Sequence, residues 1–232
     1  MKVKWNEFSS PKALARELAK KVSGELTKAV GARGRALLAI SGGTTPRLFL
    51  EELSTAPTDW DRIAVTLADE RFVPPSSNRS NARLALRHLF RNRASDAEFI
   101  SLWHSAPTVE QAARKASLTI SAQPLPLDVL VLGMGTDGHT ASLFPDAENI
   151  DQLLAATDGP PVQPVVSKAA QEPRLTLSMP VLCNARSIFL HIEGDDKRAV
   201  IEQALAGSDI LPIRAVIERA SVPVHIYWSP KE

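Results

Sequence analysis

The chain has 232 residues, of which 44% are hydrophobic and 23% charged, and its formal net charge is +1. These values are typical of a globular protein with one buried core, so we expect a single domain over residues 1–232. The near-neutral charge gives no reason to expect a nucleic-acid or membrane partner. The single cysteine, Cys183, excludes an internal disulfide. Without an apolar run of ~18 residues or a signal-peptide pattern, we expect a cytoplasmic protein and, more weakly, a monomer.

The predicted elements alternate between helix and strand. Ser10 and Pro11 form a helix start, and a stripe with a spacing of four residues follows from Leu14 to Val30. Further helices are predicted after Pro46, from Ser80, over 108–120 and over 195–205, and strands over 35–40, 62–68, 97–103, 127–133, 187–194 and 222–228. Residues 158–173 are rich in proline and are predicted to be a loop. Such alternation indicates an α/β fold with a mainly parallel sheet.

Four polar segments follow predicted strands, and in parallel α/β sheets ligands bind beyond the carboxyl ends of the strands. The first segment, SGGTTP, contains Ser41, Gly42, Gly43 and Thr44 ahead of a helix. Glycines, hydroxyls and a helix N-terminus together can hold a phosphate, although an ordinary strand-to-helix turn uses the same residues. The segment has neither the ending of a P-loop nor the GxGxxG spacing, so ATP and NAD are not expected.

The segment GMGTDGHTASLFP contains His139, the best candidate for a functional histidine. An imidazole can take up a proton close to neutral pH. Asp137 lies two residues away and can orient the ring. A helix starting near Thr140 would add N–H groups that stabilise a developing negative charge. The alternative is a histidine that only caps the turn.

Charged residues follow two further strands. Asp69, Arg71 and Arg79 lie in DERFVPPSSNRSN, where a carboxylate suits sugar hydroxyls and an arginine suits a phosphate, although a surface salt-bridge patch uses the same residues. Lys197 in EGDDKRAVI can reach a phosphate from a helix start, and Arg174 in EPRLTLSMP is similarly ambiguous. We find no ligand pattern for a metal and no Gly-x-Ser-x-Gly elbow, so a metal site and a serine esterase are not expected.

The order and spacing of these segments resemble those of the glucosamine-6-phosphate isomerase/6-phosphogluconolactonase family over nearly the whole chain. The resemblance implies a Rossmann-like open sheet with helices on both faces. It also implies hydrolysis of 6-phospho-D-glucono-1,5-lactone to 6-phosphogluconate, a step of the oxidative pentose phosphate pathway, without a cofactor. His139 would activate water with help from Asp137, and the pocket and the substrate would be held by Ser41, Gly42, Gly43, Thr44, Asp69, Arg71, Arg79, Arg174 and Lys197.

Two alternatives belong to the same group of proteins. A deaminase of aminosugar phosphates needs another acid near the histidine, typically a glutamate in the same loop. Here TASLFPD follows His139, and no glutamate occurs before Glu148. A non-catalytic sugar-phosphate sensor normally carries a helix-turn-helix ahead of its sensor domain, and only about ten residues precede the first predicted helix here. We therefore expect the lactonase.

Overall fold

A seven-stranded sheet forms the centre of the protein in a computed structural model, which describes residues 2–207 and 211–231. Its strands are, in chain order, β1 (Val3–Glu7), β2 (Ala36–Ile40), β3 (Ile63–Leu67), β5 (Glu98–Phe99), β6 (Val129–Leu132), β9 (Ile188–Glu193) and β10 (Val224–Ser229). They lie in the order β1-β10-β9-β6-β2-β3-β5, and every pairing is parallel. The predicted parallel α/β sheet is therefore confirmed.

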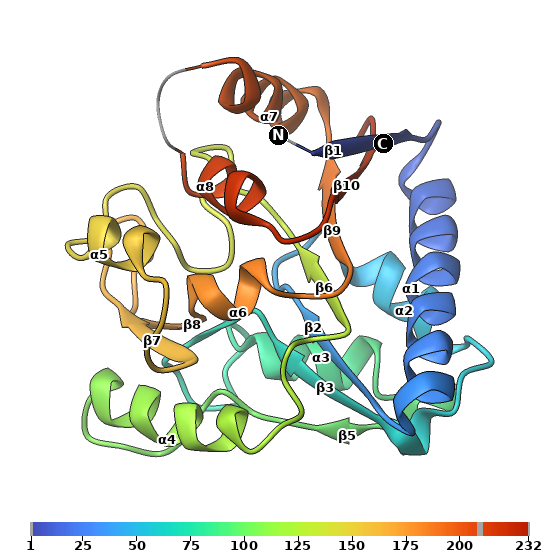
Figure 1. The fold of residues 1–232 in the computed structure, drawn as a ribbon, viewed down its shortest axis with the longest axis horizontal. Helices are drawn as coiled ribbons and strands as arrows, with labels where there is room; N and C mark the ends of the chain where they lie inside the picture. The colour runs from blue at the N-terminus through green and yellow to red at the C-terminus, as the bar shows by residue number, and fades with distance from the viewer. Residues whose placement is uncertain (1, 208–210, 232) are drawn as a thin grey trace.

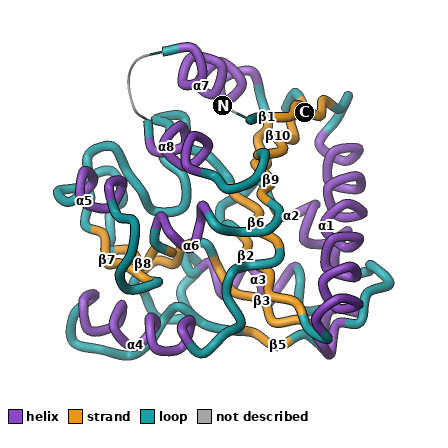
Figure 2. The backbone as a smooth tube through the Cα atoms, in the orientation of Figure 1, coloured by secondary structure: helices purple, strands orange, loops and turns teal. Residues whose placement is uncertain are grey.

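The helices lie on both faces of this sheet, as Figure 1 and Figure 2 show. α1 and α2 cover one face, and α6 and α8 lie on the other. The helices are α1 (Pro11–Arg33), α2 (Arg47–Ser54), α3 (Asn81–His88), α4 (Val109–Ser121), α5 (Ile150–Ala155), α6 (Met179–Cys183), α7 (Asp195–Ala206) and α8 (Pro212–Arg219), with 3-10 turns η1 (Trp60–Arg62) and η2 (Asn92–Asp96). Within the described ranges, no helix is both long and apolar enough to cross a membrane.

The first helix illustrates how the sequence builds these layers. The hydroxyl of Ser10 accepts the N–H of Ala13, Pro11 occupies the first turn, and Gly34 ends the helix in the left-handed region at φ 77°. Ser10 and Gly34 thus satisfy backbone groups that a helix leaves open at its ends. The predicted apolar stripe is buried, and the helix packs against the strands β2, β6 and β10.

A second sheet was not predicted from the sequence. β4 (Asp69–Arg71) pairs antiparallel with β8 (Arg174–Leu177), which pairs antiparallel with β7 (Val162–Val165). The prediction of a loop over residues 158–173 is therefore wrong at β7. The strand is short and contains Pro164, and its pairing partner β8 lies about ten residues further on, so no local pattern revealed it.

The helix predicted to start near Thr140 is also absent from the described structure. Thr140 instead forms an isolated antiparallel bridge with Leu143, and Ala141 has a φ of 49°. The hydroxyl of Thr140 donates to the carbonyl of Gly133 at 2.8 Å, and that of Ser142 donates to Asp69 at 2.6 Å. These contacts hold the segment as a turn, and the next helix begins at Ile150.

The order of the strands creates one topological switch point. From β2 the chain continues through β3 and β5 towards one edge, and from β6 it continues through β9 and β10 towards the other. β2 and β6 are neighbours, so the turns that follow them separate and leave a crevice. SGGTTP and GMGTDGH are those two turns.

Candidate active site

A cavity of about 340 Å³ lies at this switch point. Its lining includes residues from Ile40 to Pro46 after β2 and from Val131 to Gly135 after β6. Side chains of β4, β8, β9 and α7 complete the walls. The volume is within the range of pockets for small molecules.

His139 and Asp137 form a hydrogen-bonded pair at the mouth of the cavity. Nδ1 of His139 lies 2.6 Å from Oδ1 of Asp137, and the same oxygen accepts the backbone N–H of His139 at 3.1 Å. Asp137 accepts only, so the imidazole carries its proton on Nδ1 and presents Nε2 as a base. Partial burial acts to raise the pKa of Asp137, but the hydrogen bond and charge of His139 outweigh it, so the pKa is lowered.

Glycine and phenylalanine fix the plane of this imidazole. A side chain at Gly135 would overlap both His139 and Asp137. The ring of Phe144 lies 4.3 Å from that of His139, and the guanidinium of Arg174 lies over Phe144 at 5.5 Å. Sequence reasoning did not single out Phe144, although it occurs in the same glycine-rich segment. The ring of Phe144 thus contacts both the imidazole and the guanidinium of Arg174.

Several N–H groups of the GMGTDGH turn are already used. Those of Gly135 and Gly138 donate to the carbonyls of His139 and Gly135, at 2.9 and 3.1 Å. That of Gly133 donates to the hydroxyl of Ser41 at 2.9 Å. These groups hold the turn together and are not free to bind a substrate oxygen.

The SGGTT turn is different. Among the described residues, the N–H groups of Gly42, Gly43 and Thr44 donate to no acceptor. Gly43 has a φ of 94°, which glycine adopts without strain. Together with the N-terminus of α2, these groups suit an anion. Ser41 also lines the cavity, but its hydroxyl donates to the carbonyl of Val131 at 3.1 Å and so joins the two turns.

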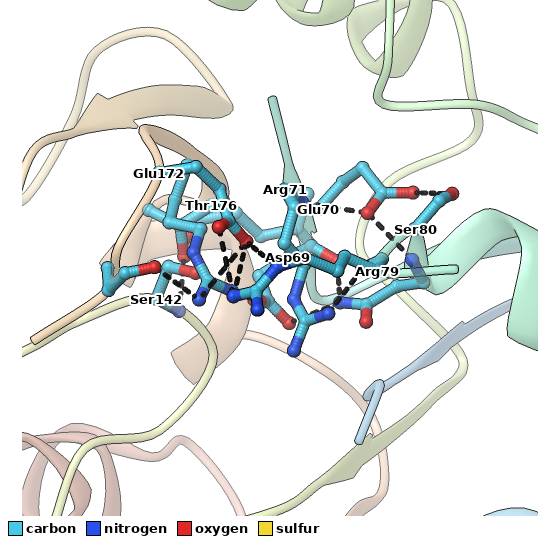
Figure 3. Close-up of polar contacts among 12 residues, drawn as sticks. Asp69, Glu70, Arg71, Arg79, Ser80, Ser142, Glu172 and Thr176 are labelled. Carbon is cyan, nitrogen blue, oxygen red and sulfur yellow. Dashed lines mark hydrogen bonds and ion pairs between the residues drawn. The ribbon is translucent and has the colours of Figure 1, made fainter. Parts of the chain in front are cut away.

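Asp69 forms the buried side of the site. Its carboxylate accepts from Ser142 at 2.6 Å and lies 3.9 Å from the guanidinium of Arg174 (Figure 3). The carboxamide of Asn81 donates to the backbone carbonyl of Asp69 at 2.9 Å. Burial lowers the pKa of Arg174 and the charge of Asp69 opposes this, and arginine stays protonated at neutral pH in any case.

Arg71 and Arg79 have different positions. Arg71 lines the cavity, and its guanidinium donates to the carbonyl of Arg79. Arg79 does not line the cavity, is exposed, and pairs with Glu172 at 2.9 Å (Figure 3). The structure therefore brings Arg71, but not the side chain of Arg79, to the cavity wall.

Lys197 lines the cavity from the first turn of α7. Burial lowers the pKa of its ammonium, against the opposing charges of Asp196 and Glu193. Within residues 2–207 and 211–231, the ammonium makes no hydrogen bond or ion pair. A half-buried cation without a partner is suited to an anionic ligand.

Most of the predicted site residues meet at this cavity. Ser41, Gly42, Gly43, Thr44, Asp69, Arg71, His139, Arg174 and Lys197 line it, Asp137 is bonded to His139, and Arg79 lies outside. Asn81 and His191 also line the cavity, and sequence reasoning singled out neither of them. No cluster of three potential metal ligands occurs among the described residues.

A polar cavity with a histidine–aspartate pair, two arginines and a lysine without a partner among the described residues, at the switch point of a parallel sheet, defines an α/β protein suited to a small anionic substrate. Residues 9–228 match the model of the family "Glucosamine-6-phosphate isomerases/6-phosphogluconolactonase". The chain belongs to this family.

Individual relatives narrow the comparison. A 6-phosphogluconolactonase of Mesorhizobium japonicum is 48% identical over 97% of this chain and 95% of that protein. One of Rhizobium meliloti is 46% identical over 96% of this chain and 97% of its own length. The crystal structure of a 6-phosphogluconolactonase from Shewanella baltica superposes with a TM-score of 0.94 at 40% identity, covering 98% and 97% of the two chains.

Proposed function

We propose that this protein hydrolyses 6-phospho-D-glucono-1,5-lactone to 6-phosphogluconate, with His139 as the general base. The observation that carries the proposal is the Asp137–His139 pair beside a cavity that also contains a free glycine turn and a half-buried lysine. The lactonase names of the relatives support the same substrate.

The hydrogen bond to Asp137 defines the role of His139. It keeps the proton on Nδ1, so Nε2 is free to accept a proton from water. The water oxygen then attacks C1 of the lactone, and the electron pair of the carbonyl moves to its oxygen. The imidazolium is stabilised by the Asp137 carboxylate.

Collapse of the tetrahedral intermediate breaks the bond between C1 and the ring oxygen. The leaving alkoxide takes the proton from Nε2, which returns His139 to its starting state. A lactone is an activated ester, so the reaction requires no covalent nucleophile and no metal or cofactor.

The developing oxyanion needs a nearby positive charge or free N–H groups. Because the N–H groups of Gly133, Gly135 and Gly138 already donate hydrogen bonds within the protein, we assign this role to the guanidinium groups of Arg71 and Arg174. Arg174 is well placed because it stacks on Phe144, which also contacts His139.

The phosphate binds between the SGGTT turn and Lys197. The turn offers N–H groups without partners, and Lys197 offers an unpaired ammonium. Anchoring the phosphate fixes the ring, so that water meets C1 in one geometry. Ser41 supports this region by holding the β2 and β6 turns together.

The cavity favours the lactonase over the deaminase. Asp69 is the one carboxylate among the described residues that line the cavity. It accepts a hydrogen bond from Ser142 and lies close to the guanidinium of Arg174. Glu148, the first glutamate after His139, is exposed and outside the lining. The second acid that deamination needs near the histidine is not part of the described cavity.

The test is hydrolysis of freshly generated 6-phosphogluconolactone, followed by acid release at constant pH. We expect a rate well above spontaneous ring opening. Binding of 6-phosphogluconate without acceleration would instead favour a sugar-phosphate sensor, and release of ammonia from glucosamine-6-phosphate would favour the deaminase.

The remaining expectations concern setting and assembly. We propose that the enzyme acts in the cytoplasm as a monomer on a small sugar-phosphate lactone, without nucleic-acid or membrane partners. Size-exclusion chromatography with light scattering tests the monomer.

A further inference from the structure

A buried histidine in the cavity wall has no role in the reaction described above. His191 lies on β9 with a relative exposure of 3%, and it lines the cavity. Its ring and that of Phe49 pack edge to face, with their centroids 6.1 Å apart, and Nε2 of His191 lies 3.2 Å from Oε1 of Glu193. The two side chains are two residues apart on one strand and so lie on the same face of the sheet.

The contacts of His191 define its protonation. Burial lowers the pKa of this histidine, the hydrogen bond and charge of Glu193 oppose the shift, and the charge of Lys197 adds to it. The net shift is downward, so the ring is neutral at pH 7. Because a carboxylate only accepts, the proton sits on Nε2 and is donated to Glu193. Nδ1 is buried and has no partner within the described residues.

Glu193 connects this histidine to the phosphate end of the cavity. It is the last residue of β9, Gly194 follows with a φ of 93°, and Lys197 lies in the first turn of α7. Only residues 194–196 separate Glu193 from Lys197, so both lie at the same end of β9, and the charge of Glu193 opposes the lowering of the pKa of Lys197. Nevertheless no ion pair joins them in the described structure.

Both carboxylates that act on Lys197 are engaged elsewhere. Asp196 pairs with Lys231 at 2.9 Å, and Glu193 accepts from His191. A glutamate released from its partner would gain a charge interaction by turning to the ammonium. The contact with His191 therefore opposes an ion pair that would occupy Lys197.

We propose that His191 is a positioning residue that holds Glu193 away from Lys197 and so keeps the ammonium free for the substrate phosphate. This inference rests on the proposed function, in which Lys197 binds the phosphate. It assigns His191 to substrate affinity and not to proton transfer, which belongs to His139.

The first test is His191→Leu, which removes the donor to Glu193. We expect KM for the lactone and Kd for 6-phosphogluconate to rise roughly fivefold, the scale of one partly screened ion pair. The change in kcat should be smaller, because His139 and Asp137 are untouched. His191→Gln retains an N–H donor and should restore most of the affinity.

The decisive test adds Glu193→Gln to His191→Leu. If the released glutamate blocks Lys197, the double variant regains affinity for 6-phosphogluconate in calorimetry. A merely structural role for His191 predicts no recovery. A double variant as weak as His191→Leu alone would overturn the proposal, as would unchanged affinity in His191→Leu.

Two further variants separate the possible failures. His225→Leu removes a histidine from the neighbouring strand, outside the cavity lining, and controls for loss of a strand histidine. Lys197→Met tests the phosphate role itself. If Lys197→Met weakens binding and His191→Leu does not, the inference about His191 is wrong and the proposed function stands. If Lys197→Met has no effect, the phosphate assignment fails first, and the inference about His191 fails with it.

Discussion

One oxygen of Asp137 accepts hydrogen bonds from both the imidazole Nδ1 and the backbone N–H of His139, at 2.6 and 3.1 Å. A single carboxylate thus fixes the ring and the turn that carries it. The intervening Gly138 has a φ of 79°, a conformation that other residues rarely adopt. The DGH triplet is therefore a structural unit, and its parts can be tested separately.

Replacing His139 with alanine should remove the base and leave the binding groups in place. We expect kcat to fall by about 10²–10⁴-fold, the usual contribution of a positioned general base. The Kd for 6-phosphogluconate, measured by calorimetry, should change little. His104→Ala, outside the cavity lining, is the control. A variant with nearly full kcat would show that another group activates water.

Replacing Asp137 with asparagine should lower kcat and shift its pH dependence. The imidazolium would lose a charge-assisted hydrogen bond, so protonation of the base would require more acid. We expect the acid limb of the kcat profile to move down by about one pH unit. The lowered pKa of Asp137 means that this carboxylate stays ionised while the limb of the wild-type enzyme is measured. Coincident limbs in the two proteins would contradict the role of Asp137.

The sequence predicted which segments meet at one cavity where these segments follow buried strands. β2, β6 and β9 are apolar throughout most of their length, and SGGTT, GMGTDGH and EGDDK come directly after them. Parallel strands bring their carboxyl ends to one edge, so these segments had to approach each other. This is why His139, Gly43 and Lys197 could be assigned to one cavity.

Features that depend on pairing between distant segments could not be predicted in this way. The pairing of β4 with β8 is one such feature, because β4 has only three residues and β8 lies about a hundred residues further on. The contact between Arg174 and Phe144 also joins residues that are distant in the sequence, and no local pattern indicates it. His191 stands among apolar residues of a strand, and only the fold shows that the end of that strand forms the cavity wall.

Glu70 is expected to be important for stability, not for chemistry. It is fully buried, and its carboxylate accepts the N–H groups of Arg71, Asn81 and Ala82 and the hydroxyl of Ser80 (Figure 3). Glu70→Ala would leave these buried donors without an acceptor. We expect a loss of about 3 kcal/mol or more in the free energy of unfolding, measured with urea. Glu148→Ala, at an exposed position, should lose little.

Lys197→Met should weaken substrate binding while raising the thermal stability. Burial lowers the pKa of Lys197 in the folded protein, so folding disfavours its charged form. This cost is present at pH 7, where the ammonium is charged in both states. It disappears as the pH rises above the unfolded value of about 10.4.

The expected result is a higher Tm for Lys197→Met than for the wild type at pH 7, with a difference that shrinks above pH 10. KM should rise at the same time, since the phosphate loses its cation. Lys20→Met, at an exposed position of α1, is the control. A lower Tm for Lys197→Met at pH 7 would mean that the buried ammonium stabilises the fold.

Gly42→Ala should disturb the site through Asn81. A methyl group at Gly42 would overlap the carboxamide of Asn81, which is 2% exposed and donates to the carbonyl of Asp69 at 2.9 Å. Because this carboxamide has little room to move, the SGGTT turn must shift and carry its free N–H groups away from the phosphate. We therefore expect a higher KM for the lactone in steady-state kinetics. Gly24→Ala, with no atom near its added methyl, should leave KM unchanged.

Gly42→Ala combined with Asn81→Ala makes room for the methyl group, and the combined effect should be smaller than the sum of the two single effects. Strict additivity would show that the two residues act independently.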